Sequence, residues 1–238
     1  MNNPQLPLTY NNQSTDLQAE IQHSFIMRVY GWMAFGLIIT AMAALMTLSI
    51  PGLLMAIVSN TFVFLGLVIS ELVVVVVLSR AINRFSPAVA GLVFTGYAIL
   101  NGITLSIVML VYTDTSVALT FGITACTFGI MTLFGYTTHR DLTKMGSLLI
   151  MALFGLILAS LANLFFNNSA IYWIVTYVGV LIFIGLIAYD TQKLKRMALG
   201  LGSDGQMMQK ASILGALSLY LDFINLFLML LRIFGRRR

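Results

Sequence analysis

Apolar stretches of about 20 residues recur along most of this 238-residue chain, and they constrain its fold more than any other feature. A helix rises about 1.5 Å per residue, so about 20 apolar residues cross the roughly 30 Å hydrocarbon core of a bilayer. Charged residues make up only 9% of the chain, whereas a soluble domain carries about 25%. The chain therefore cannot cover a soluble domain of its size with charge, and we expect the lipid bilayer to surround it.

Seven apolar spans can be drawn, and we expect each of them to be a transmembrane helix. Strands of a membrane β-barrel would alternate in polarity over about ten residues, and no span here alternates. The linkers are short, so we predict one all-α integral membrane domain over residues 26–235. A flexible polar segment over 1–25 precedes it, and a basic tail over 236–238 follows it. The expected spans are 26–49, 54–79, 87–112, 116–137, 147–166, 170–192 and 208–234.

Lysine and arginine are unevenly distributed among the linkers. The second, fourth and sixth linkers carry all of the basic linker residues, and the first, third and fifth carry none. Basic linkers favour the cytoplasm, so we predict a cytoplasmic N-terminus. Seven full spans would place Arg232 and the basic tail on the far side, against this rule, so the side of the C-terminus stays open. The basic linker residues are Arg80, Arg84, Arg140, Lys144, Lys193, Lys195, Arg196 and Lys210.

Small residues recur four apart in the third and fourth spans. Such spacing favours close helix contact, and a pore lining of small residues is the alternative. The residues concerned are Gly91, Thr95, Gly102 and Ser106 in the third span and Gly122, Cys126 and Gly129 in the fourth.

Glu71, Asp190 and Asp222 are the ionisable residues that lie away from the span ends. A charged group costs about 3 kcal/mol or more inside the membrane, so such groups normally face a protein interior or a water-filled cavity. Each of the three is therefore a candidate functional residue. A structural pairing with a neighbouring helix is the alternative for each.

Asp222 is the deepest of the three and lies on a polar stripe of its helix. Residues three and four apart share a helix face. This stripe predicts a hydrated path or a buried polar seam, with Ser218, Asn225 and Glu71 as its polar lining. Its members are Gly215, Ser218, Asp222, Asn225, Met229 and Arg232.

Two neighbouring carboxylates can share one proton and titrate as a pair. They can also bind Ca²⁺, which prefers oxygen ligands, so Asp190 and Asp222 are also candidate metal ligands. Competition between protons and Ca²⁺ for the same oxygens is a physical basis for a pH-sensitive cation path. Arg80 and Arg84 follow the second span, and either could reach inward to such a pair. The alternative for each is an ordinary basic residue at the membrane surface, whose apolar stem lies along the span.

Signals for catalysis are weak. His23 and His139 lie outside the spans or at their edge, and Cys126 is the single cysteine, so no cluster typical of a zinc site is present. The glycine-rich segment over 200–205 follows a helix, whereas a dinucleotide-binding loop follows a strand. We therefore predict that the chain is not an enzyme and has neither a cofactor nor a nucleic-acid partner.

Four segments resemble the transmembrane Bax inhibitor motif family, in its bacterial branch. They are "NGITLS" (101–106), "HRDLTKMGSLL" (139–149), "IAYDTQKLK" (187–195) and "LGALSLYLDFINLFLMLLRIFG" (214–235). The resemblance covers about residues 25–235 and implies seven helices, with the last one central and surrounded by the other six. It also implies a pH-dependent Ca²⁺ leak in a bacterial inner membrane.

The resemblance further implies roles for particular residues. Asp190 and Asp222 would form the pH sensor and gate, and Arg84 or Arg80 would be an arginine latch that holds them. The glutamate of the second helix falls on Glu71. The alternative function is a non-conducting regulator that binds other membrane proteins, such as a membrane protease.

Overall fold

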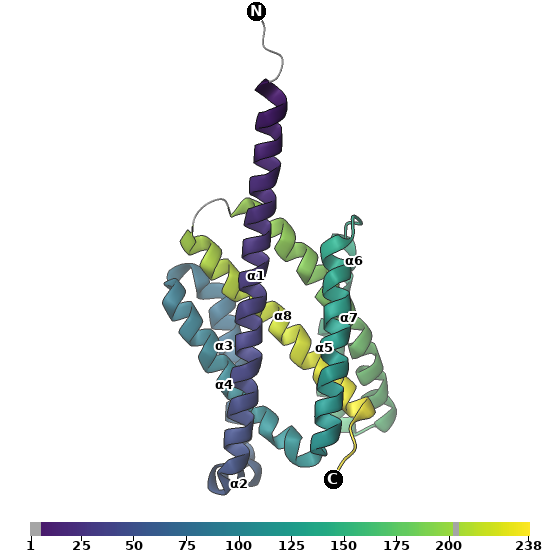
Figure 1. Ribbon diagram of the computed structural model, residues 1–238. Coiled ribbons are helices and arrows are strands. Elements are labelled where there is room, and N and C mark those ends of the chain that lie inside the picture. The colour runs from purple at the N-terminus through teal and green to yellow at the C-terminus, as the bar shows by residue number, and fades with distance from the viewer. Residues whose placement is uncertain (1–5, 202–204) are drawn as a thin grey trace, which may run out of the picture.

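The computed structural model describes residues 6–201 and 205–238, which form an almost continuous series of helices (Figure 1). Within these ranges the only β pairing is an isolated bridge between Tyr112 and Arg237. The helices are α1 (Leu6–Ser49), α2 (Pro51–Ser59), α3 (Thr61–Ala81), the short 3₁₀ helix η1 (Ile82–Arg84), α4 (Pro87–Val111), α5 (Asp114–Thr137), α6 (Thr143–Phe166), α7 (Ser169–Gly200) and α8 (Gly205–Phe234).

Seven helices of the described part are long and apolar enough to cross a membrane, as predicted from the sequence. The second of them begins at Thr61, later than the predicted residue 54. The Asn60 side chain accepts hydrogen bonds from the backbone N–H groups of Phe62 and Val63, and this cap starts a new helix there. Residues 51–59 instead form α2, a separate short helix with Pro51 in its first turn.

The first helix extends further toward the N-terminus than the predicted span. α1 begins at Leu6, so it includes residues 6–25 of the segment that we expect to be flexible. Phe25 is fully buried, and the Gln22 side chain donates a hydrogen bond to the Lys195 carbonyl group of α7. The end of this segment therefore packs on the bundle, and its flexibility stays a prediction.

α8 is the most deeply buried helix of the bundle. In its most apolar stretch 72% of the residues are buried, compared with 6% in α3 and in α6. α8 packs mainly against α1, α4, α5 and α7, and in Figure 1 it runs obliquely between them. α3 packs mainly on α4, and α6 packs on α7. Four helices thus make the main contacts with α8, and the prediction that all six other helices surround it stays a prediction.

Glycine permits close approach of α4 to α1, as predicted for the third span. A Cβ atom on Gly102 would clash with the backbone carbonyl group of Thr40, and one on Gly91 would meet the ring of Trp32 at 2.9 Å. These two glycines therefore set the distance between α1 and α4.

The small residues that share one face of the fourth predicted span do not bring α5 close to another helix. Gly122, Cys126 and Gly129 are exposed on α5, and no neighbouring helix of the described structure comes within 4 Å of a Cβ placed at either glycine. The prediction of a helix contact there is wrong. α5 instead approaches α7 at Gly135, whose Cβ would clash with the backbone of Ala188.

The C-terminus lies at the opposite end of the bundle from the N-terminus (Figure 1). α8 runs through the bundle to Phe234, and the basic tail then pairs with the linker between α4 and α5. The backbone N–H of Thr113 donates to the Arg236 carbonyl group, and Arg238 forms an ion pair with Asp114. The last helix is therefore a complete span, and the basic tail lies at the end away from the basic linkers.

We expect Gly102→Ala to destabilise the protein by about 1–3 kcal/mol, because the added methyl group meets a backbone carbonyl that cannot move aside. The apparent melting temperature in detergent measures this loss. Gly122→Ala is the matched control, because it adds the same methyl group in open space and favours the helix. Equal melting temperatures for the two variants would contradict the close contact of α1 and α4.

Candidate functional site

The Asp222 carboxyl group is buried in the middle of α8. Its side chain is 6% exposed, and its Oδ2 atom has no hydrogen-bond partner among the described residues. A buried polar atom without a partner is costly, and more so in a membrane span. Such a group is a candidate for function rather than for stability.

α7 places Asp190 near Asp222. α7 and α8 pack against each other and place Asp190 near enough to Asp222 for a charge on one carboxyl group to act on the other. Asp190 is only half-buried, whereas Asp222 is almost fully enclosed. The structure thus brings together the two acidic residues that the sequence singles out in the sixth and seventh spans.

The polar stripe of α8 faces α7 along most of its length. A Cβ on Gly215 would meet the Leu194 side chain at 2.5 Å. Near the other end of the stripe, the Arg232 guanidinium lies 5.3 Å from the centre of the Tyr172 ring. The stripe that contains Asp222 is therefore a polar seam between two helices.

A pocket of about 260 Å³ lies beside Asp190, between α3, α7 and α8. Ser218 lines it, as expected of a polar lining residue. Asn225 lies elsewhere, and its side chain donates to the Leu221 carbonyl group of its own helix at 2.8 Å. The pocket is lined by Ser79, Asp190, Lys193, Leu194, Met197, Leu214, Gly215, Leu217, Ser218 and Leu221.

Lys193 is the cation that acts on Asp190, from one turn further along α7. Arg80 and Arg84 are exposed at the end of α3 and in η1, and neither belongs to an ion pair of the described residues. Ser79, immediately before Arg80, lines the pocket. The arginine latch therefore stays a prediction, and Arg80 is the nearer candidate along the chain.

Glu71 belongs to a chain of hydrogen bonds that links four helices. Thr104 and Asn101 of α4 donate to its carboxylate at 2.6 and 3.4 Å. The Tyr220 hydroxyl group of α8 donates to Asn101 Oδ1 at 3.0 Å and lies 2.6 Å from the Thr40 hydroxyl group of α1. Glu71 is therefore held in this hydroxyl–amide network and does not line the pocket beside Asp190.

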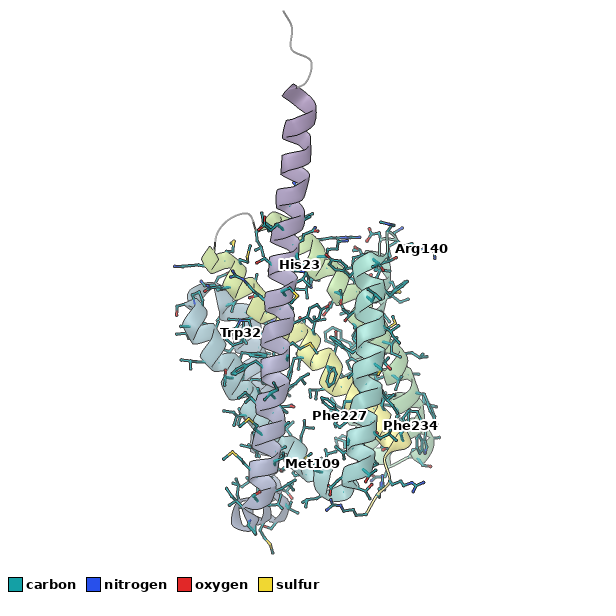
Figure 2. All side chains as sticks on the ribbon, viewed as in Figure 1. His23, Trp32, Met109, Arg140, Phe227 and Phe234 are labelled. Atoms are coloured by element: carbon teal, nitrogen blue, oxygen red, sulfur yellow. The ribbon has the colours of Figure 1, made fainter. Side chains whose placement is uncertain are left out.

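Gln192, two residues after Asp190, holds the linker between α5 and α6 against α7. Its Nε2 donates to the Arg140 carbonyl group at 2.8 Å, and its Oε1 accepts from the Leu142 backbone N–H at 2.9 Å. Figure 2 shows Arg140 at the tip of this linker. The two segments "HRDLTK" and "DTQKLK" thus contact each other in the fold.

Asp141 strengthens the same contact from the linker side. It forms an ion pair of 2.9 Å with Arg196 of α7. Hydrogen bonds from the hydroxyl and backbone N–H groups of Thr143, together with the Arg196 guanidinium, lower the pKa of Asp141 from 3.8 to about 2. Asp141 is therefore ionised at any physiological pH and does not sense pH.

Among the described residues, no three His, Cys, Asp or Glu side chains are arranged to hold a metal ion. Asp190 and Asp222 supply two carboxylates, whereas Ca²⁺ takes six to eight oxygen ligands. Water and carbonyl oxygens would have to complete the shell. Ca²⁺ binding by Asp190 and Asp222 therefore stays a prediction.

Sequence reasoning missed the partners that these residues find in the fold. Tyr220, Thr40 and Gln192 are absent from the predicted site because neutral polar side chains are common at helix contacts. One signal was present: Tyr220 lies two residues before Asp222 in the stretch that carries the family resemblance.

Comparison with known proteins shows similarity over nearly the whole chain. A sequence model of the family described as "Inhibitor of apoptosis-promoting Bax1" (Bax1-I) matches residues 22–238. The inner membrane protein YbhL of Escherichia coli (strain K12) is 49% identical over 216 residues, which cover 90% of this chain and 92% of that protein. A protein of Borreliella burgdorferi is 43% identical over 218 residues (92% and 94%), and protein RP147 of Rickettsia prowazekii is 41% identical over 235 residues (98% and 97%).

We expect Gln192→Ala to loosen the linker between α5 and α6, because it removes two hydrogen bonds to the linker backbone. Faster amide hydrogen exchange over residues 139–146, measured by mass spectrometry in detergent, would show this. Gln209→Ala, at an exposed position of α8, is the control and should leave exchange in the linker unchanged. Unchanged exchange in Gln192→Ala would show that the contact does not hold the linker.

Proposed function

Because the chain belongs to the Bax inhibitor-like (Bax1-I) family, we propose that it is a bacterial inner-membrane protein through which cations, chiefly Ca²⁺, leak down their gradient. Asp190 and Asp222 are the proposed proton-sensitive gate. The single observation that carries the proposal is the placement of these two carboxylates together in a membrane-spanning bundle. Asp190 borders a pocket, and Asp222 is enclosed behind it.

The proposed gate works through the charge of the pair. Two ionised carboxylates repel each other and attract a cation, either a basic side chain or a passing ion. A shared proton removes one negative charge and weakens both effects. Protonation then shifts the population of closed and open arrangements by the difference in their proton affinities. In the closed arrangement, the proposed latch is Arg80 or Arg84.

A cation that passes the acid pair needs further polar groups to contact on its way through the bundle, and the described structure contains some of them. The network of Glu71, Asn101, Thr104, Tyr220 and Thr40 supplies a carboxylate, an amide and three hydroxyl groups between α1, α3, α4 and α8. These groups are bonded to one another in this arrangement. A conducting arrangement would replace some of those bonds with bonds to water or to the ion.

The alternative function is a non-conducting regulator that binds other membrane proteins. The outer faces of α3 and α6 support it, because only 6% of the most apolar stretch of each helix is buried within the chain. Lipid covers such faces equally well. A buried acid pair has no role in lateral binding, so we favour the leak.

Calcium influx into proteoliposomes that contain a calcium indicator tests the gate. We expect the wild-type influx to rise severalfold as the pH falls from neutral to acidic, because protonation opens the gate. Asp190→Asn and Asp222→Asn imitate the neutral carboxyl group, so their influx should be high at neutral pH and depend little on pH. Glu20→Gln is the control, because it neutralises an exposed acidic residue of α1 outside the acid pair, and its calcium influx should match that of the wild type.

Two outcomes of this experiment would overturn the proposal. Identical pH profiles in the wild type and both aspartate variants would exclude the acid pair as the gate. No influx above that of protein-free vesicles at any pH would exclude the leak itself. Co-purification of a defined membrane protein would then favour the regulator.

The proposed arginine latch leads to a further prediction, which concerns calcium influx at neutral pH. Arg80→Gln or Arg84→Gln should raise calcium influx there, because the closed arrangement loses the cation that holds the acid pair. Lys144→Gln, which removes an exposed charge from α6 at the same end of the bundle, should leave the influx unchanged. If neither arginine variant differs from the wild type, the latch is wrong and Lys193 is the remaining cation beside Asp190.

A further inference from the structure

A second concave site lies on the outer face of the bundle, between α1, α4 and α8. It consists of two adjoining hollows of about 780 and 350 Å³, which share Arg28, Trp32 and Phe35. Volumes of this order are typical of sites that bind small molecules. We call the two hollows together the α1–α4 groove. Its further lining residues are Gly31, Pro87, Ala88, Gly91, Leu92, Thr95, Gln209, Ser212 and Ile213.

The walls of the groove are apolar in character. Phe35 is 41% exposed and Leu92 is 73% exposed. The hydroxyl groups of Thr95 and Ser212 donate to the carbonyl groups of Gly91 and Gln209 in their own helices, so they present no free donor to the groove. Apart from the Gln209 side chain, this part of the groove therefore favours an apolar occupant.

Trp32 forms a fixed part of the wall. It packs on Gly91, where a Cβ atom would lie 2.9 Å from its ring, and its ring meets Phe94 edge to face at 6.1 Å. Figure 2 labels Trp32 on α1, in the half of the bundle nearer the N-terminus. The tryptophan therefore reports on whatever enters the groove.

One end of the groove carries a positive charge. Arg28 is exposed, and among the described residues it forms no ion pair. It lines the same hollow as Pro87, the first residue of α4, and so lies where that span begins. From Arg28 to Phe35 the groove descends about 10 Å along α1, at about 1.5 Å per residue. It thus leads from a cation at the membrane surface into the apolar interior.

We propose that the α1–α4 groove binds an anionic phospholipid. The phosphate of the headgroup contacts Arg28, and an acyl chain lies along Trp32, Phe35 and Leu92. A cation above an apolar channel matches an amphiphile with one negative head, whereas a protein helix would not need a charge at one end only. The basic linkers lie at this same end, where anionic lipids are attracted to lysine and arginine. The site does not depend on whether the protein conducts ions.

Quenching of Trp32 by lipids with brominated acyl chains tests this site. The chain has two tryptophans, so Trp173→Phe leaves Trp32 as the single reporter. The protein is reconstituted in mixtures of phosphatidylglycerol and phosphatidylcholine, with bromine on one lipid or on the other. We expect phosphatidylglycerol to be preferred at Trp32 roughly fivefold, the effect of about one basic residue at a membrane surface.

Matched variants separate the charge from the shape of the groove. Arg28→Gln should reduce the preference to about one, whereas Arg140→Gln, at an exposed arginine of the linker between α5 and α6, should leave it unchanged. Ala88→Phe fills the groove and should reduce quenching by both lipids. Ala152→Phe, at an exposed position of α6, should not. Equal quenching by both lipids with Arg28 present, or a preference that persists in Arg28→Gln, would overturn the proposal.

Discussion

Polar groups inside a membrane-spanning bundle must find partners within the protein, because the hydrocarbon core offers none. This constraint affects α8 more than any other described helix, because 72% of its most apolar stretch is buried and its polar side chains must find partners inside the bundle. It carries Tyr220 into contact with α1 and α4, where the hydroxyl group has two partners. It carries Asp222 toward α7, where Oδ2 has no partner within the described residues. A satisfied group stabilises the bundle, whereas a buried atom without a partner costs free energy, and this contrast is why the proposed function rests on Asp222 and not on Tyr220.

The two outer helices have a different relation to the core. Most apolar residues of α3 and α6 are exposed to the surroundings of the bundle, and only a few, such as Leu78 and Leu156, are buried in the core. α3 contacts the interior through three residues: Glu71 joins the hydroxyl–amide network, Leu78 is fully buried in the core, and Ser79 lines the pocket beside Asp190. α3 is thus a peripheral helix that packs mainly on α4 and buries less of its surface than α8 does.

The sequence predicts the spans and the acidic residues well, because both signals are local. Apolar length alone defines seven helices, and the cost of a charge in lipid identifies Glu71, Asp190 and Asp222. The partner of a residue in the fold, in contrast, can lie far away along the sequence, so a local pattern does not identify it. Small residues four apart show where helices are able to approach, and in α5 the spacing at Gly122 matches no neighbour. The cap at Asn60, which divides the predicted second span, uses a residue type equally common in turns.

The geometry of α8 connects the acid pair to the network of Glu71. With 3.6 residues per turn, Tyr220 and Asp222 point about 200° apart, so they lie on nearly opposite faces of one helix. A rotation of α8 that changes the contact of Asp222 with Asp190 also moves the Tyr220 hydroxyl group relative to Asn101 and Thr40. Asn101 in turn donates to Glu71 of α3, and the last turn of α3 borders the pocket of Asp190. α8 thus carries one member of each polar site: Tyr220 belongs to the network of Glu71, and Asp222 belongs to the acid pair.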